Sequence, residues 1–232
     1  MISKNHKELI NDIINYKINN DKDLYQKRII FDSLMEMNNP VILEFGVNTG
    51  ASSSIFAYVA EKKNGYVYSI DIEDCKDVII SDNWYFLKTN DLDTKKILET
   101  FEKLIHGIDL IYIDSYHDSE HVKKLAYNWF PYLKKNGIMF FDDTDNLIYR
   151  ERKLIPHTVN VGEINEMVDM IYSSNHNNIV YSKTHGSSGL SSYIKINNIG
   201  DELKPINNIW TVNFFIKHIY IYMRKIYKYL KK

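Results

Sequence analysis

Cysteine is almost absent from the 232-residue sequence, in which Cys75 is the only one. A single cysteine excludes an internal disulfide and suits a reducing compartment. No apolar run reaches the roughly 18 residues of a membrane-spanning helix. The first 20 residues mix charges into every turn, unlike a signal peptide. These absences predict a cytoplasmic protein.

An excess of charge of one sign is also missing, because the formal net charge is -1. A nearly neutral chain gives no electrostatic reason to expect nucleic acid as a partner. The hydrophobic fraction of 44% and the charged fraction of 25% are ordinary for a globular protein and exclude wholesale disorder. The length suits one domain with extensions.

The stretch that organises the chain is VILEFGVNTG, residues 41–50, followed by an apolar run that ends in Asp71. Gly46 and Gly50 allow a sharp turn and a close approach of the backbone to a ligand. The spacing E-x-G-x-x-x-G is not the G-x-G-x-x-G of dinucleotide folds, and no Lys-Ser/Thr pair follows as in a phosphate-binding loop. An acid at the end of the next strand can accept both hydroxyls of a ribose. The pattern is typical of a nucleoside site.

Strands and helices alternate along the middle of the chain, which predicts a Rossmann-like, doubly wound, mostly parallel α/β sheet. The expected strands are residues 41–45, 66–72, 84–88, 110–114 and 138–141, and an antiparallel pair at 178–184 and 190–196 completes about seven. Helices are expected at residues 6–19, 24–37, 51–63, 93–106, 119–133 and 162–173. The predicted organisation is an N-terminal helical extension (1–39), the sheet domain (40–197), and a linker with a C-terminal helix (198–232).

Acidic residues gather at or just after the carboxyl ends of the expected strands, where parallel sheets bind ligands. Chance would not keep them to one edge, so a site is predicted there, although turn acids and helix caps are common alternatives. The acids are Glu44, Asp71, Asp91, Asp114, Asp142 and Asp143.

Residues 144–161 show no clear period, and we expect them to form the substrate loop. His157 in that loop and His185 in a later connection are weak candidates for the site. Cys75 follows the strand that ends in Asp71 and is expected to pack near the bound base rather than act as a nucleophile.

The last 24 residues, 209–232, combine apolar residues at helical spacing with lysines and Arg224, and no acid follows Glu202. A basic amphipathic helix of this kind can lie on an anionic membrane. It can equally pack on its own domain or on a second subunit in a homodimer, and composition does not separate these alternatives.

With these residues laid out, the chain resembles class I S-adenosylmethionine-dependent methyltransferases. Residues 44–50 (EFGVNTG) look like the first motif of that family, and Asp71 looks like its ribose-binding acid. The segments IDLIYIDSYH (108–117) and WFPYLKKNGIMFFDD (129–143) are similar to the branch that holds macrolide-type sugar O-methyltransferases and cephalosporin-hydroxylase-like proteins.

The resemblance implies S-adenosylmethionine as cofactor and assigns roles to single residues. Residues at the first motif would line its methionine part, residues after the second strand its ribose, and residues after the third its adenine. In that order these are Glu44, Gly46, Asn48, Gly50 and Ser52; Asp71 and Ile72; and Asn90 and Asp91, with Asp114 also facing the cofactor. In metal-dependent members, acids in the places of Asp114, Asp142 and Asp143 hold a divalent cation, and oxygen ligands favour Mg²⁺.

One position departs from the pattern of the sugar methyltransferases. The acid that can serve as base two residues after the fourth-strand aspartate is here Tyr116. His117 is the next candidate for the general base, with Asp114 beside it in the catalytic set, and His121 is a weaker second.

The sequence therefore predicts an O-methyltransferase that acts on a sugar hydroxyl of a glycan or glycosylated metabolite, with Mg²⁺ as an optional helper. The basic C-terminal helix suggests an acceptor near the inner face of the membrane. A hydroxylase-like enzyme and a non-catalytic nucleoside-binding or assembly module on the same fold stay as alternatives.

Overall fold

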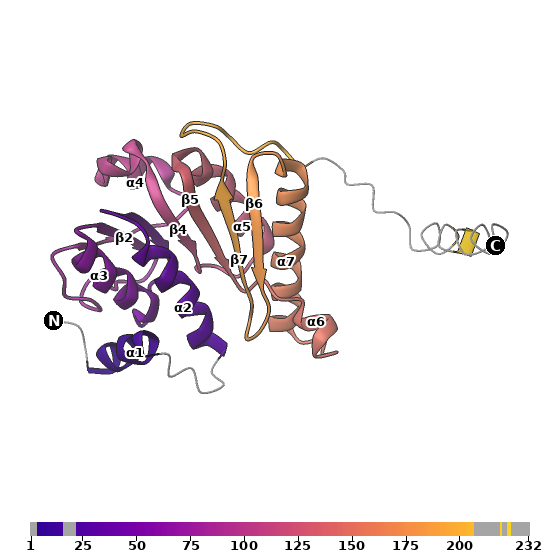
Figure 1. Ribbon diagram of the computed structural model, residues 1–232, viewed down its shortest axis with the longest axis horizontal. Coiled ribbons are helices and arrows are strands. Elements are labelled where there is room, and N and C mark those ends of the chain that lie inside the picture. The colour runs from indigo at the N-terminus through magenta and orange to yellow at the C-terminus, as the bar shows by residue number, and fades with distance from the viewer. Residues whose placement is uncertain (1–3, 16–21, 207–218, 220–221, 224–232) are drawn as a thin grey trace.

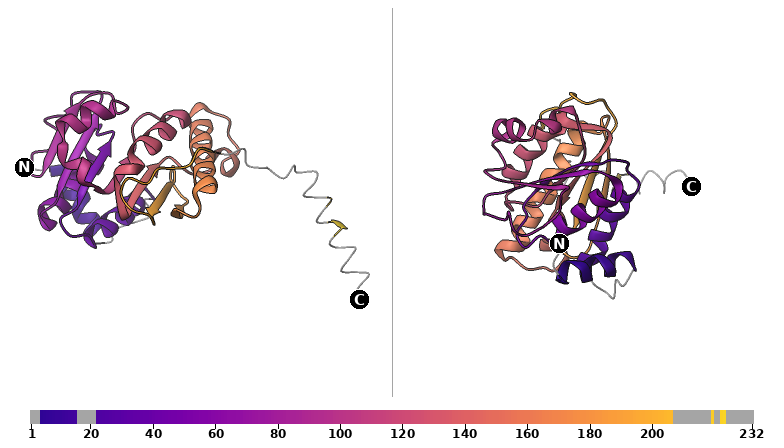
Figure 2. Two further views of the ribbon diagram at one scale, coloured as in Figure 1. Left: turned by 90° about the horizontal axis from the view of Figure 1, so that it is seen from above. Right: turned by 90° about the vertical axis from the view of Figure 1, so that its left-hand side faces the viewer.

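The computed structural model describes residues 4–15, 22–206, 219 and 222–223. Within these residues, seven strands form one sheet in the order β3-β2-β1-β4-β5-β7-β6, with helices on both faces (Figures 1 and 2). Neighbouring strands are parallel except β7, which runs antiparallel to β5 and β6. The expected Rossmann-like sheet with an antiparallel last strand is confirmed.

The helices and strands follow in alternation from the N-terminus, with two short 3-10 helices, η1 and η2. In chain order they are α1 (Lys4–Ile14), α2 (Lys22–Met35), β1 (Val41–Phe45), α3 (Ala51–Lys63), β2 (Tyr66–Asp71), β3 (Trp84–Lys88), α4 (Thr94–Thr100), η1 (Glu102–His106), β4 (Ile108–Ile113), α5 (Ser119–Trp129), η2 (Phe130–Tyr132), β5 (Leu133–Asp142), α6 (Leu147–Arg150), α7 (Pro156–Asn175), β6 (Ile179–Thr184) and β7 (Leu190–Lys195).

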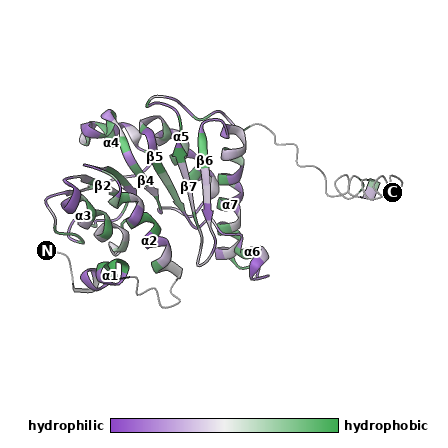
Figure 3. Ribbon diagram, in the orientation of Figure 1, coloured by the Kyte–Doolittle hydropathy of each residue, from purple (hydrophilic) through white to green (hydrophobic). Residues whose placement is uncertain are grey.

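The core has two parts, one on each face of the sheet. Ile13 of α1, Leu34 of α2 and Phe56 of α3 are fully buried in one hydrophobic cluster. Trp129 of α5 and Ile171 of α7 are fully buried in the other. The central strands are mostly hydrophobic (Figure 3), as expected where both faces of a parallel sheet are covered.

The order in which the chain adds strands to the sheet changes side at β1. The chain first builds β2 and β3 on one side of β1 and then crosses to β4 and β5 on the other side. Such a switch point opens a crevice at the carboxyl ends of the strands, which is where open α/β sheets bind ligands. The topology thus places the site at the ends of β1, β2, β4 and β5.

Several predicted elements have different bounds in the structure, and the predicted helix 93–106 is divided into α4 and η1. Residues 135–137 were expected to form a turn before a short strand, but β5 runs through them from Leu133. Its register against β4 shifts between Leu133 and Ile138, and Asn136 in this stretch has a φ of 64°. The predicted loop 144–161 contains α6 and the first turn of α7, which begins at Pro156 rather than at 162. Proline is suited to a first helical position because it lacks an N–H there and has a fixed φ.

In the part of the chain that the structure describes, no helix is long and apolar enough to cross a membrane. The predicted amphipathic helix at 209–232 lies almost entirely outside the described residues. Its contact with a membrane or with a second subunit therefore stays a prediction.

Candidate active site

The turn after β1 approaches the neighbouring strand ends so closely that its glycines have no room for a side chain. Gly46 has φ +92°, and a Cβ there would lie 2.0 Å from the carbonyl oxygen of Asp114. Gly50 has φ +83°, and its Cβ would lie 2.3 Å from a methyl group of Val78. The glycines therefore let the turn pack closely against the chain itself, and the expected approach of their backbone to a ligand stays a prediction.

Asp71, at the end of β2, holds this turn in place. Its Oδ2 accepts hydrogen bonds from the backbone N–H groups of Val47 (2.8 Å) and Asn48 (3.2 Å), and its Oδ1 accepts one from Glu73 (2.9 Å). Burial alone would raise the pKa of Asp71, but these N–H donors outweigh it and lower the pKa below its ordinary value. Asp71 is therefore an ionised carboxylate at the cavity wall.

Glu44 lies under the turn rather than in it. Its carboxyl group is fully buried and accepts hydrogen bonds from the hydroxyls of Ser52 (2.6 Å), Ser53 (2.7 Å) and Ser69 (2.5 Å). Burial raises its pKa from 4.5 to about 7, although the three hydroxyls oppose the shift. Glu44 thus supports the turn from below and does not line the cavity beside it.

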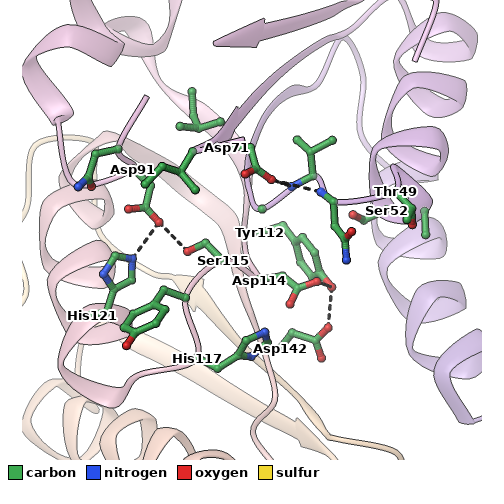
Figure 4. Close-up of a pocket in the computed structure, with 18 of the residues that line it drawn as sticks. Thr49, Ser52, Asp71, Asp91, Tyr112, Asp114, Ser115, His117, His121 and Asp142 are labelled. Atoms are coloured by element: carbon green, nitrogen blue, oxygen red, sulfur yellow. Dashed lines mark hydrogen bonds and ion pairs between the residues drawn. The ribbon is translucent and has the colours of Figure 1, made fainter. Parts of the chain in front are cut away.

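A cavity of about 570 Å³ opens between the turn and the ends of β2, β3, β4 and β5 (Figure 4). This volume is in the range of small-molecule sites. Glu44, Gly50 and Asp143, three of the predicted site residues, are not part of its lining. The predicted residues that line it are Gly46, Asn48, Ser52, Asp71, Ile72, Asn90, Asp91, Asp114 and His117, together with Asp142.

Asp91 sits at one end of the cavity and is held by two donors. Its Oδ2 lies 2.6 Å from the hydroxyl of Ser115 and 2.8 Å from Nε2 of His121 (Figure 4). His121, a secondary candidate for the general base, is therefore committed to Asp91.

Asp114 and Asp142 meet at the hydroxyl of Tyr112, which sequence analysis did not single out. This hydroxyl donates to Asp142 (2.8 Å) and lies 3.3 Å from Asp114. Burial raises the pKa of both carboxyl groups, and neighbouring carboxylates add to it, Asp142 in the case of Asp114 and Asp143 in the case of Asp142. The pair therefore needs a shared proton or a cation to be stable.

Asp143 pairs with His117, and its charge raises the pKa of both Asp114 and Asp142. It has φ +56°, and its carboxylate forms an ion pair with Nδ1 of His117, whose side chain is 51% exposed. Among the described residues, no three His, Cys, Asp or Glu side chains are grouped so as to hold a metal ion. The predicted three-aspartate metal site therefore stays a prediction, and Asp143 is paired with the candidate base.

A second cleft of about 590 Å³ adjoins the first and is predominantly polar. The two share Lys27 of α2 and Asp142. Its lining comprises Gln26, Lys27, Asp142, Asp143, Leu147, Arg150, Glu151, Ile155, His157, Thr158, Ser187 and Ser188. His157 is thus placed in this cleft, which we call the polar cleft.

One wall of the polar cleft is the connection between β6 and β7. The amide of Gln26 donates to the carbonyl of Gly186 (2.6 Å), and Arg150 donates to that of Ser187 (2.9 Å). Arg150 also pairs with the buried Asp145 (2.7 Å), which His185 approaches from the other side (3.4 Å). His185 lines neither the cavity nor the polar cleft.

Cys75 is buried, and its thiol lies 3.8 Å from the carbonyl oxygen of Asn48. Burial, and then the charge of Asp71, raise the pKa of the thiol. A protonated, buried thiol is not a nucleophile.

Comparison with known proteins relates the segment that forms the cavity to methyltransferases. Residues 43–144 match the sequence profile of a family described as a methyltransferase domain. They contain the glycine turn and Asp71, Asp91, Asp114, Asp142 and His117. Residues 43–144 therefore carry a methyltransferase domain, which supports the predicted resemblance to class I S-adenosylmethionine-dependent methyltransferases.

Solved methyltransferase structures share the fold of the domain. A Staphylococcus aureus protein proposed to be a caffeoyl-CoA O-methyltransferase is 19% identical, with a TM-score of 0.59 over 83% of this chain and 100% of its own. CalS11 from calicheamicin biosynthesis is 17% identical (TM-score 0.52; 82% and 92% covered). MycE from the mycinamycin pathway is 17% identical (TM-score 0.51; 79% and 50% covered). No curated protein sequence matches the chain.

The cavity of the methyltransferase domain suits S-adenosylmethionine. Gly46, Val47 and Asn48 of the turn after β1 line the cavity, which would bring the backbone of the turn next to the cofactor. The ionised Asp71 stands at the end of β2, where an acid binds ribose in such folds. The individual cofactor contacts, including those assigned to Glu44 and Gly50, stay predictions.

Lys27, Tyr112 and Ser115 line the cavity but were not predicted as site residues. Tyr112 precedes Asp114 by two residues, and period-2 alternation along β4 could have placed both on one face. Ser115 directly follows Asp114, but nothing in the sequence pairs it with Asp91. Lys27 lies on a helix outside the predicted domain, and no local pattern identifies it.

Proposed function

We propose that the methyltransferase domain transfers the methyl group of S-adenosylmethionine to a hydroxyl oxygen of a sugar, on a glycan or a glycosylated small molecule. The observation that carries this proposal is the contact between the cofactor cavity and the polar cleft at Lys27 and Asp142. A methyl group held in the first cavity can meet an acceptor held in the second only at such a junction.

The lining of the polar cleft supports a polyhydroxylated acceptor. It offers donors, such as Lys27 and Arg150, next to acceptors, such as Asp142 and Asp143. Sugar hydroxyls donate and accept, so a mixed lining suits them better than an apolar one. Among the structural relatives, CalS11 is described as a TDP-rhamnose 3′-O-methyltransferase.

In this proposal, His117 removes the proton of the acceptor hydroxyl. Its Nδ1 faces Asp143, which fixes the tautomer and leaves the lone pair of Nε2 for the proton. Asp143 raises the pKa of His117, and partial burial opposes the shift. Alignment of the hydroxyl oxygen with the methyl group is the other requirement of this in-line displacement.

We further propose that Asp114 and Asp142 hold a Mg²⁺ ion. Both carboxyl groups are buried and have a neighbouring carboxylate that raises their pKa, which is compatible with a cation. Mg²⁺ commonly binds through one or two carboxylates with water and substrate oxygens. When bound, the ion would lower the pKa of the acceptor hydroxyl and orient it. MycE was solved with Mg and SAH.

The test is transfer of label from methyl-tritiated S-adenosylmethionine by the full chain to a panel of methyl glycosides and nucleotide sugars, with MgCl2 or EDTA. We expect labelled sugar ethers that resist mild alkali, and loss of about 10²- to 10⁴-fold in rate in His117→Ala. His106→Ala, an exposed histidine outside the cavity, is the control. Label found only in alkali-labile esters or in amines would overturn the sugar proposal, and equal rates with MgCl2 and EDTA would overturn the Mg²⁺ proposal.

A further inference from the structure

The connection from α6 to α7 forms an exposed rim of the polar cleft. Residues 149–157, which include the end of α6 and the start of α7, are all exposed, and we call them the rim segment. Four of them, Arg150, Glu151, Ile155 and His157, line the cleft. Figure 1 shows α6 at one end of the domain, away from the centre of the sheet. The rim segment therefore borders the cleft and also faces whatever lies outside the molecule.

Large hydrophobic side chains of the rim segment are open to solvent. Tyr149, Leu154 and Ile155 are 68%, 83% and 49% exposed, and Pro156 is exposed beside them. A single exposed hydrophobic residue needs no explanation, because much of any protein surface is apolar. Several in one short segment leave more apolar area in water, which is unfavourable in proportion to that area. They indicate a surface that is covered by a partner.

Positive charge accompanies these hydrophobic residues. The rim segment carries three cations, Arg150, Arg152 and Lys153, against one acid, Glu151. Arg150 is turned onto the buried Asp145 (2.7 Å). Lys153 lies 3.9 Å from Glu151 in an exposed pair, which adds little stability, and within the part of the chain that the structure describes no ion pair involves Arg152. Arg152 and Lys153 are thus available to an anionic partner.

The combination of charges and apolar residues narrows the choice of partner. A second copy of the chain that docked symmetrically through the same segment would bring Arg152 and Lys153 of both copies together, and such like-charge contacts are unfavourable. An anionic lipid surface offers negative headgroups to the cations and an apolar layer beneath them to the hydrophobic side chains. Lysine and arginine next to exposed leucine and aromatic residues are typical of protein surfaces that bind such lipids.

We propose that the rim segment docks on a membrane surface that carries anionic lipid headgroups. Arg152 and Lys153 bind the headgroups there, and Tyr149, Leu154 and Ile155 enter the apolar layer. Docking holds the opening of the polar cleft at the headgroups, since Ile155 belongs both to the docking surface and to the lining of the cleft. The inference goes beyond the proposed function and does not depend on it, because docking needs neither the cofactor nor a methyl acceptor.

The experiment is co-sedimentation of the full chain with vesicles of phosphatidylcholine, alone or mixed with an equal amount of phosphatidylglycerol. We expect the wild-type chain to bind the anionic vesicles, and to bind them more weakly as the salt concentration rises. Every variant keeps residues 207–232, whose sequence is also basic. A difference between variants therefore reports on the rim segment.

Replacement of Leu154 tests the apolar part of the surface. Leu154→Ser combined with Tyr149→Ser removes two exposed side chains that do not line the polar cleft, and should lower the partition coefficient on anionic vesicles by about tenfold or more. Leu154→Trp should raise it, because tryptophan favours the membrane interface. Ile105→Ser in η1, where the isoleucine is 49% exposed, is the control and should bind like wild type.

Replacement of two adjacent cations tests the charged part. Arg152→Ser combined with Lys153→Ser should lower the partition coefficient on anionic vesicles by about 10- to 30-fold and leave binding to pure phosphatidylcholine unchanged. The control is Lys95→Ser combined with Lys96→Ser, two adjacent exposed lysines of α4, which changes the net charge of the chain equally. Equal effects of the two double variants would show that only the net charge matters and would overturn the proposal.

Three other outcomes would also overturn the docking surface. The first is absence of wild-type binding to anionic vesicles. The second is equal binding by wild type and the double variant of Leu154 and Tyr149, since another part of the chain would then bind the lipid. The third is a dimer that Leu154→Ser dissociates, without vesicle binding, which would assign the rim segment to a second copy. Calorimetry of the same preparations with S-adenosylhomocysteine keeps the proposed function separate: cofactor binding without vesicle binding overturns this inference alone.

Discussion

The carboxylate of Asp143 is paired with Nδ1 of His117 and is not directed at its neighbour Asp142. The positive φ of Asp143 turns its side chain toward the segment after β4, where His117 lies. Adjacent acids at the end of β5 thus have different partners: Asp142 shares a tyrosine hydroxyl with Asp114, and Asp143 pairs with the candidate base. This division makes the pH dependence of the enzyme a direct test of the site.

The activity of the wild-type enzyme should fall on the acid side with a midpoint above 6.5, because a general base must be neutral to act and Asp143 raises the pKa of His117. In Asp143→Asn the anionic partner is lost, so the midpoint in a kcat/KM profile should move to lower pH. The plateau rate should also fall, since the imidazole loses its orientation. An unchanged midpoint in this variant, with His106→Gln as the control for a distant histidine, would show that His117 is not the titrating base.

Gly46 and Gly200 allow a matched test of the turn after β1. Their φ angles are +92° and +91°, but a Cβ at Gly46 meets the Asp114 carbonyl at 2.0 Å, whereas one at Gly200 meets nothing within 4 Å. Gly200→Ala should cost about 1–2 kcal/mol for backbone strain alone. Gly46→Ala should cost more and abolish binding of S-adenosylhomocysteine. Chemical denaturation and calorimetry measure both effects, and equal costs at the two sites would refute the close approach.

Glu44 should make the folded protein less stable as pH rises. Its pKa is raised from 4.5 to about 7, so the native state binds a proton that the unfolded chain releases between these values. The free energy of unfolding should therefore fall by about 3 kcal/mol from this group as pH rises through that window. Glu44→Gln cannot titrate and should flatten the curve of urea stability between pH 4.5 and 7. A curve of unchanged slope in the variant would show that the carboxyl group is not buried as described.

Tyr112→Phe should destabilise the protein without creating a cavity. The hydroxyl donates to Asp142 at 2.8 Å and lies near Asp114, so its removal leaves two buried carboxyl groups without this donor. The expected loss is about 1–3 kcal/mol, the cost of an unsatisfied buried polar group. If a cation takes the place of the donor, added MgCl2 should restore part of the lost stability. Urea denaturation with and without MgCl2 measures the free energy of unfolding in each case. Stability equal to wild type in both conditions would contradict the role of Tyr112.

The sheet and one edge of its site could be predicted because both follow from local pattern. Apolar runs at regular spacing fix the strands, and acids such as Asp71 and Asp114 follow the runs directly. The irregular stretch of β5 at Asn136 was mistaken for a turn, because an asparagine followed by glycine is typical of both turns and irregular strands. The start of α7 was missed because Pro156 and its charged neighbours resemble a loop.

The features of the site that could not be predicted from the sequence depend on long-range contacts. Lys27 reaches the junction of the two cavities from α2, which packs against α3 only in the folded chain. Glu44 lies at a strand position that suggests a ligand contact, but serines from α3 and β2 surround it. The pairing of Asp143 with His117 could not be predicted, because it depends on the backbone angle of Asp143, which the sequence does not specify.

Calorimetric titration of the full chain with S-adenosylhomocysteine tests the central claim most directly. We predict saturable binding by the wild-type chain, weakened by about 10- to 100-fold or more in Asp71→Ala, which removes a charged acceptor and releases the turn after β1. Asp74→Ala, an exposed acid three residues later that does not line the cavity, should bind like wild type. Absence of binding by the wild-type chain, or equal binding by both variants, would contradict the assignment of this cavity to the cofactor.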